Sequence, residues 1–312
     1  VGGWGAFVAA SGEKLHVIMP AGHPVIPWTT LVVGLWIPNF YYWGLNQFIT
    51  QRTLAAKSLR QGQLGIIFAA FLKLLIPFII IMPGIISWQL YKAQLTAPGA
   101  TTDQAYPLLI KNLVGPGLRG FILAAIAGAV ISTLGSLLNS VATLLTMDIY
   151  KRHFKKDADG TSLLRIGRWS TLVFVVAVCL IAPELGNPKF KGIFNYIQEF
   201  QGFISPGILA AFVFGLFVKK TPRAAGITAL LANVPIYGLL MWKFSSVAFL
   251  NRIGITFVAL LFILAVLTLV RPLKEPIALP VQQGFDLTPA PALRVLGPLV
   301  IVLTLTLYVI FR

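Results

Sequence analysis

A single charged side chain interrupts a long apolar stretch of this chain. Residues 64–88 read LGIIFAAFLKLLIPFIIIMPGIISW, and the charged residue is Lys73. At about 1.5 Å of helix per residue, Lys73 lies more than ~10 Å from the nearer end of the stretch. An ammonium that deep in a membrane costs roughly 2.5–3.5 kcal/mol, and such groups usually face a bundle interior or a water-filled path. Lys73 is therefore a candidate for lining a substrate or ion path; the alternative is a lysine whose stem reaches the interface.

Amide and aromatic side chains follow a helical period shortly before this stretch. In the segment WIPNFYYWGLNQFITQR, one helical face is predicted to carry Asn39, Tyr42, Trp43, Asn46 and Thr50. Amides bond hydroxyl groups and rings cover apolar surface, so this face suits a polyhydroxylated ligand. Helix–helix packing through Asn and aromatic residues gives the same pattern, and the spacing alone leaves both interpretations open. Pro38 is expected to break the helical hydrogen-bond ladder here.

Two adjacent hydroxyls lie in the middle of a third apolar segment. The segment AIAGAVISTLGSLLNSVATLLTMDIY contains Ser132 and Thr133, with Ala129 one turn earlier. Hydroxyl and carbonyl oxygens are hard ligands of the type that a hard cation needs. Small residues four apart are equally typical of helix packing, and Ser and Thr hydroxyls often bond the preceding turn. On the residues alone, packing is the stronger interpretation.

A fourth segment, FNYIQEFQGFISPGILAAF, carries Gln198, Gln201 and Ser205 on one predicted face. Pro206 and Gly207 are expected to bend this helix. Glu199 falls on another face, where it either pairs with a basic residue or lies near the outer interface. Polar helix packing is again the alternative.

These candidates belong to a chain with the composition of a membrane protein. Of its 312 residues, 57% are hydrophobic and 11% are charged, and the mean hydropathy is +0.84. Crossing a bilayer takes about 20 apolar residues. We therefore predict an all-α integral membrane protein with about eight transmembrane helices, over residues 27–49, 63–91, 118–148, 165–186, 193–217, 222–243, 252–272 and 292–311.

The net charge of +16 is explained by topology rather than by nucleic-acid binding. Fifteen lysines and arginines fall in or beside the loops on one predicted side, and nine on the other. The positive-inside rule places the richer side in the cytoplasm, so the first span runs inward. We predict a multi-pass protein of the cell (inner) membrane whose surroundings are the lipid bilayer.

Few side chains here suit tightly bound metals. Cys179 is the single cysteine, so neither a disulfide within the chain nor a thiolate metal site is expected. His16 and His23 lie in a loop rich in Gly and Pro, and we interpret them as ordinary loop residues. A short interfacial helix, AYPLLIKNL, is predicted between the second and third spans.

Long runs of this sequence resemble the sodium/solute symporter family. They are NFYYWGLNQFITQRTLAAKS with GIIFAAFLKLLIPFIIIMPGI, GLRGFILAAIAGAVISTLGSLLNSVATLLTMDIYKR, and YIQEFQGFISPGILAAFVFGLF. The chain looks most like the bacterial sodium/glucose and sodium/galactose cotransporters, over essentially its whole length. The resemblance implies a leucine-transporter-like fold of two inverted five-helix repeats, with substrate and sodium near the bilayer midplane.

The resemblance also implies roles for individual residues. Sugar ligands match Asn39, Lys73 and Gln198, and the aromatic gate matches Tyr42 with Trp43 beside it. Sodium ligands match the carbonyl of Ala129 and the hydroxyls of Ser132 and Thr133; the family often has Ser where Thr133 stands. Weaker candidates are Asn46, Ser136, Asn139 and Gln201.

The match implies a particular domain organisation. Residues 1–26 correspond to an extracytoplasmic loop, 27–218 to the second inverted repeat, and 219–312 to C-terminal flanking helices. Complete family members have about fourteen helices, so the chain matches the last eight. Helices of the first repeat are an expected partner from the same polypeptide.

The function that follows is sodium-coupled symport of a sugar such as glucose or galactose, with Na⁺ and sugar as partners and no enzyme activity. One alternative keeps the mechanism and changes the solute to an amino acid, vitamin or polyol. Others are a sugar sensor that does not transport, a sodium-leak channel, and a structural membrane fragment.

Overall fold

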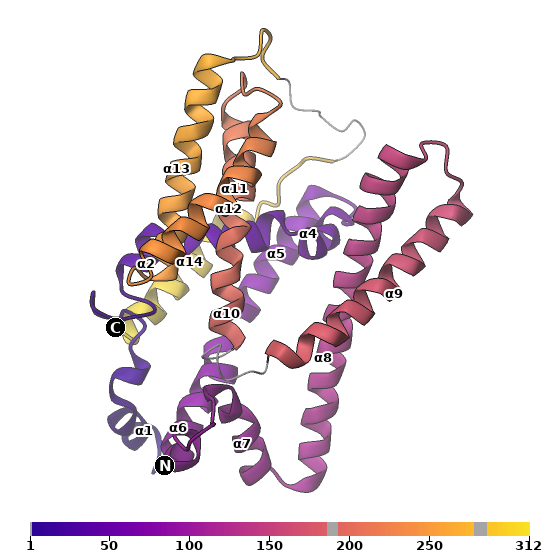
Figure 1. Cartoon of the computed structure of the whole chain (residues 1–312). Helices are drawn as coiled ribbons and strands as arrows, with labels where there is room; N and C mark the ends of the chain where they lie inside the picture. Colours follow the sequence, from indigo (N-terminus) through magenta and orange to yellow (C-terminus); the bar gives the residue numbers. More distant parts are fainter. Residues whose placement is uncertain (1, 186–192, 278–285) are drawn as a thin grey trace. The chain divides into compact units, whose positions relative to one another are not determined.

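The computed structural model describes residues 2–185, 193–277 and 286–312, and these residues form helices and loops without a strand (Figure 1). The predicted all-α class is confirmed. The helices are α1 (Trp4–Ser11), α2 (Thr29–Val33), α3 (Trp36–Phe40), α4 (Gln47–Leu54), α5 (Leu59–Lys73), α6 (Met82–Leu95), α7 (Ala105–Leu113), α8 (Pro116–Thr143), α9 (Gly160–Leu185), α10 (Ile193–Phe200), α11 (Ser205–Phe217), α12 (Ala225–Lys243), α13 (Phe249–Val270) and α14 (Leu293–Ile310).

Within the described residues, six helices are long and apolar enough to cross a membrane, and a bent pair brings the number to seven. The six are residues 59–95, 116–154, 160–183, 225–243, 249–270 and 293–310. The pair is α10 with α11, whose axes meet at 44°. Pro206 lies in the first turn of α11, where its missing N–H leaves no helical bond unmade, so the proline starts a new helix after the bend. The bend expected there is confirmed.

The remaining predicted span, 27–49, is a series of short helices. The first break falls at Gly34, one turn before Pro38, so that Pro38 lies in the first turn of α3. A π-helical segment follows at Tyr41–Leu45, and Asn46 is extended. The interruption expected at Pro38 therefore occurs on both sides of it. π-Helical segments are frequent at functional sites.

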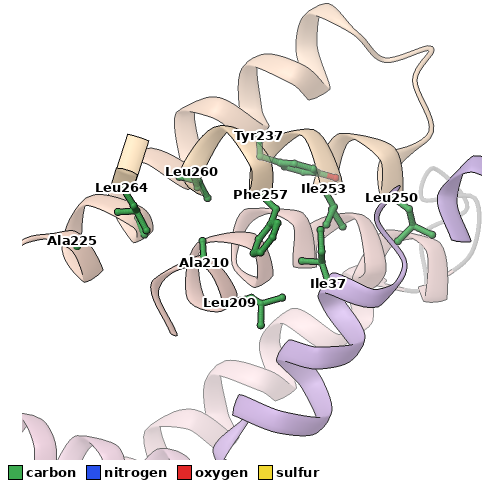
Figure 2. Close-up of a cluster of buried hydrophobic side chains, with 11 residues drawn as sticks. Ile37, Leu209, Ala210, Ala225, Tyr237, Leu250, Ile253, Phe257, Leu260 and Leu264 are labelled. Atoms are coloured by element: carbon green, nitrogen blue, oxygen red, sulfur yellow. The ribbon is translucent and has the colours of Figure 1, made fainter. Parts of the chain in front are cut away.

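The chain forms two compact units, 1–77 with 194–312, and 78–193. This division is distinct from the repeat over 27–218, which stays a prediction. The core of the first unit is built around α13, which packs against α11 and α12 (Figures 1 and 2). Ile253, Phe257, Leu260 and Leu264 face that core at spacings of four, three and four, as one helical face requires.

A short helix joins this core. Ile37 of α3 is fully buried beside Leu209, Ile253 and Phe257 (Figure 2). Small residues such as Ala210 and Ala229 allow the surrounding helices to approach closely, which is how packing replaces the hydrophobic effect inside a membrane. The segment that carries Asn39 is thereby held by the core.

The second unit contains α6 to α9. The interfacial helix predicted from AYPLLIKNL is present as α7, and Ser87 of α6 donates a hydrogen bond of 2.6 Å to the carbonyl of Ala105 at its start. Arg119 donates to the carbonyls of Lys111 and Val114, which fixes the turn from α7 into α8. α8 and α9 pack side by side.

Candidate functional site

A cavity of about 400 Å³ lies in the first unit, within the range typical of small-molecule sites. It is lined by Pro38, Asn39, Tyr42, Trp43, Lys73, Ile197, Gln198 and Gln201. The three sugar-ligand candidates, both gate residues and the weaker candidate Gln201 thus meet at one cavity. They come from α3, the π-helical segment, the end of α5, and α10 with the turn that follows it.

Lys73 lies at the last position of α5 and is exposed. Its Nζ is 3.5 Å from the centroid of the Trp43 ring, a cation–π contact. In the part of the chain that the structure describes, no carboxylate pairs with this ammonium. The ring therefore stabilises the ammonium, and the N–H donors that do not face the ring are available to a ligand in the cavity.

The amides at the cavity differ in what they can offer. The Asn39 Nδ2 donates to the Leu35 carbonyl at 2.8 Å, which leaves the Asn39 Oδ1 as the acceptor for a ligand. Gln198 and Gln201 are three residues apart and half-buried, so their side chains lie on one face of α10 and its following turn. Together with Lys73, the cavity presents both donors and acceptors, as a hydroxyl group needs.

Aromatic rings close part of this wall. The rings of Tyr42 and Trp43 meet edge to face with centroids 5.1 Å apart, and Phe48 lies 5.7 Å from Tyr42 on its other side. The contact with Phe48 spans the extended residue Asn46, so it ties the π-helical segment to α4. Tyr42 is thus held by rings from both sides of the helix break.

Asn46 and Thr50 do not line the cavity, although regular helical spacing predicts them on the face of Asn39. The π-helical turn and the extended Asn46 change the helical phase after Tyr42. The carbonyl of Asn46 instead accepts a hydrogen bond of 3.1 Å from the Thr50 hydroxyl.

The sodium candidates lie in α8, in the second unit. The Thr133 hydroxyl donates to the Ala129 carbonyl at 3.0 Å, and the Ser136 hydroxyl to the Ser132 carbonyl at 3.1 Å. Ala129, Ser132 and Thr133 are exposed on α8. The carbonyl of Asn139, a weaker candidate, accepts from Thr143 at 2.8 Å. Three oxygens of the predicted ligand set thus lie within about one turn, and the Thr133 hydroxyl is bonded back to its own helix, as α-helical Ser and Thr commonly are.

Two features of the site were missed from the sequence. Ile197 adds an apolar wall to the cavity, although nothing in its spacing separates it from an ordinary core residue. A second cavity, of about 540 Å³, is lined by α4 and α5 and shares Trp43 and Lys73 with the first. Four Gly and Ala positions of α5, at residues 62, 65, 69 and 70, line it, and this small-residue pattern was the available signal.

Comparison with known proteins identifies the family of this chain. The profile of the sodium:solute symporter family matches residues 8–232. The chain belongs to the sodium:solute symporter family. Membership confirms the resemblance seen in the sequence, and it supports a multi-pass membrane transporter rather than an enzyme.

Several curated symporters are similar to this family member. The sodium/glucose cotransporter of Vibrio parahaemolyticus is 41% identical over 78% of the chain and 47% of its own length. The uncharacterized symporter YidK of Escherichia coli is 31% identical over 89% of the chain and 48% of its own length. The human sodium/myo-inositol cotransporter 2 is 33% identical over 71% of the chain and 34% of its own length. The chain spans about half the length of the first two.

Proposed function

We propose that this chain supplies the second inverted repeat and flanking helices of a sodium-coupled symporter of the cell (inner) membrane, and that its solute is a sugar such as glucose or galactose. The observation that carries the proposal is the single cavity that brings together Asn39, Lys73 and Gln198. Family membership supports the coupling to sodium.

The sugar binds through complementary hydrogen bonds. Lys73 donates to ring hydroxyls, the Asn39 Oδ1 accepts from one, and Gln198 and Gln201 each do either. Trp43 and Ile197 cover the apolar faces of the sugar, and Tyr42 closes the site on the cytoplasmic side. A neutral polyol matches this set because the cavity offers a single ammonium and no carboxylate among its lining residues.

Sodium binds at α8 through the Ala129 carbonyl and the hydroxyls of Ser132 and Thr133. In its present bond to Ala129 the Thr133 hydroxyl donates its proton, so the lone pairs of its oxygen are available to the ion. Sodium binding stabilises an outward-open state, sugar follows, and one set of helices then rocks against the other. Other segments of the symporter complete the sodium shell, since three protein oxygens are fewer than a hard cation usually takes.

The coupling is energetically sufficient for concentrative uptake. One Na⁺ crossing 100 mV supplies about 2.3 kcal/mol. A tenfold sodium gradient adds roughly 1.4 kcal/mol, so that one ion can concentrate a neutral sugar several-hundred-fold, to order of magnitude.

A second solute class follows from the same site. A polyol carries the hydroxyls that the cavity recognises, and one of the similar proteins is named a sodium/myo-inositol cotransporter. A sugar sensor, a leak channel and an inactive membrane fragment are the remaining alternatives, and none of these accumulates solute.

Uptake into proteoliposomes separates these possibilities. The protein encoded by the gene that carries this sequence is reconstituted, and radiolabelled galactose, glucose and myo-inositol are supplied with and without an inward sodium gradient. We expect sodium-driven accumulation of galactose or glucose. Accumulation of myo-inositol alone would identify a polyol symporter, and binding without accumulation would identify a sensor.

A further inference from the structure

α10 and the turn after it carry two groups of contact residues, and only one of these groups lines the cavity. Gln198 and Gln201 line the cavity. Glu199 and Gly202, each one residue later, contact α13 and α12 instead. The side of this segment away from the solute is therefore held by helices that line no part of the cavity.

The contact with α13 is an ion pair. Nη2 of Arg252 lies 2.6 Å from Oε1 of Glu199, and the side chains are 6% and 40% exposed. Arg252 also lies 5.8 Å from the centroid of the Tyr237 ring. The basic partner expected for Glu199 is thus a buried residue of the first turns of α13.

The contact with α12 is a close fit around Gly202. A methyl group at this glycine would overlap the Tyr237 ring, which is itself fully buried. Asn233 donates to the Gly202 carbonyl at 3.3 Å, and Phe203 meets Tyr237 edge to face at 4.9 Å. The turn between α10 and α11 is consequently fixed against α12.

The same part of α13 holds the other polar wall of the cavity. Gly34, just after α2, lies so close to the Leu250 carbonyl that a methyl group there would overlap it. Gly254 approaches the Val33 backbone in the same way, and Asn251 donates to the Thr29 hydroxyl at 2.8 Å. Phe257 then meets Trp36 edge to face at 5.2 Å, in the helix that carries Asn39.

We propose that residues 250–257 of α13 position the solute site, with Arg252 holding α10 through Glu199 while its neighbours hold α2 and α3. Arg252 is a positioning residue: it does not line the cavity and acts through Glu199. The inference rests on the proposed function, because it specifies how flanking helices set the geometry of that site.

The chemistry of the contact favours positioning over bulk stability. Burying an ion pair is costly, and well-packed apolar residues of similar volume are often as stabilising or more so. The Arg252 Nε and the Tyr237 hydroxyl are buried and have no hydrogen-bond partner within the described residues. An ion pair instead fixes the relative orientation of the two helices that it joins. A binding site needs this because small misplacements of its ligating groups weaken binding.

The test combines a distance measurement with a binding measurement. Spin labels are attached at Asn39→Cys and Gln198→Cys in a Cys179→Ser background, and dipolar broadening reports the spread of distances across the cavity. Arg252→Met removes the buried charge at similar volume, and Lys243→Gln is the matched control, since Lys243 is exposed on α12 and contacts Trp242. We expect a wider distribution for Arg252→Met and an unchanged one for Lys243→Gln.

Galactose affinity is measured in parallel, without labels, for Glu199→Gln, Arg252→Met and the double variant. We expect each single variant to bind about 10-fold more weakly and the double variant no more weakly than either, because the two residues act as one unit. The melting temperature without sugar checks that folding is retained. Additive losses, or affinity falling only in step with the melting temperature, overturn the inference.

The two measurements distinguish failure of this inference from failure of the proposed function. If the wild-type protein binds no sugar but Arg252→Met widens the distance distribution, positioning stands and the sugar assignment is wrong. If the distribution is the same in wild type and Arg252→Met, positioning is wrong whatever the solute.

Discussion

The ammonium of Lys73 rests 3.5 Å above the ring of Trp43, and the same two residues line both cavities on this side of the first unit. The contact joins the end of α5 to the π-helical segment that follows α3. A cation that contacts a ring instead of a carboxylate keeps the donors that face away from the ring free for a neutral solute.

Replacing Lys73 tests its role as a ligand. We expect Lys73→Ala to lower galactose affinity by at least about 100-fold, because two hydrogen bonds from a charged donor contribute roughly 1.5–3 kcal/mol each. Equilibrium binding to the protein in detergent measures this loss. Lys243→Ala, which removes an exposed cation on α12, is the control and should bind as the wild type does. Unchanged affinity in Lys73→Ala would refute the assignment.

The hydroxyl of Thr133 is expected to bind sodium. Thr133→Ala should raise the sodium concentration for half-maximal uptake about 10-fold or more, since a hard cation loses one of its few oxygen ligands. Thr133→Ser keeps the hydroxyl and should stay within a few-fold of the wild type. Thr143→Ala is the matched control, because the Thr143 hydroxyl also donates to the carbonyl four residues earlier on the same helix. Equal effects of Thr133→Ala and Thr143→Ala would mean that helix packing explains both.

The fit of Gly202 against Tyr237 sets a steric limit on this position. Gly202→Ala should destabilise the protein by about 1–3 kcal/mol, because the added methyl forces the ring or the turn to shift. A thermal unfolding curve in detergent measures this. Gly226→Ala in α12 meets no neighbouring atom and should unfold at the wild-type temperature or above it, as alanine favours helix. An unaltered melting point in Gly202→Ala would show that the ring moves freely.

Asp159 precedes α9 and is expected to titrate below its ordinary range. Hydrogen bonding to the Ser162 side chain, chiefly, lowers the pKa of this carboxyl. A carboxyl with a lowered folded-state pKa contributes stability above its unfolded pKa of about 3.9, and that contribution is lost as the pH falls through the folded value. The start of α9 should therefore loosen only in acid below the ordinary Asp range.

Carbon-13 labelling of the five aspartates makes this titration visible by NMR. Ser162→Ala should move the pKa of Asp159 back up toward the ordinary value. Asp286, held low by the hydrogen bond to Thr288, is the internal control and should not change. A Ser162→Ala titration identical to that of the wild type contradicts the assignment.

The sequence by itself determined the class of the protein and which residues are candidates for binding the solute. In a bilayer the backbone groups of a run of about 20 apolar residues must bond one another, and a helix satisfies them. Seven of the eight predicted spans accordingly correspond to long helices or to the bent pair. Lys73 was identified because a lone charge in such a run is costly, a property that needs no tertiary information. Asn39 and Gln198 were matched through the long runs that resemble the family.

Tertiary structure decided which polar residues meet. Regular spacing placed Asn46 with Asn39, whereas the π-helical segment changes the phase and leaves Asn46 outside the cavity. Local periodicity does not predict this break. The short helices are held in place by the packing of Ile37 into the core and by the close approach of Gly34 to Leu250, which are contacts between distant segments. The pairing of Glu199 with Arg252, 53 residues apart, likewise depends on how α10 and α13 pack. Contacts between distant segments are set by the fold, and a single sequence read along its length does not encode them locally.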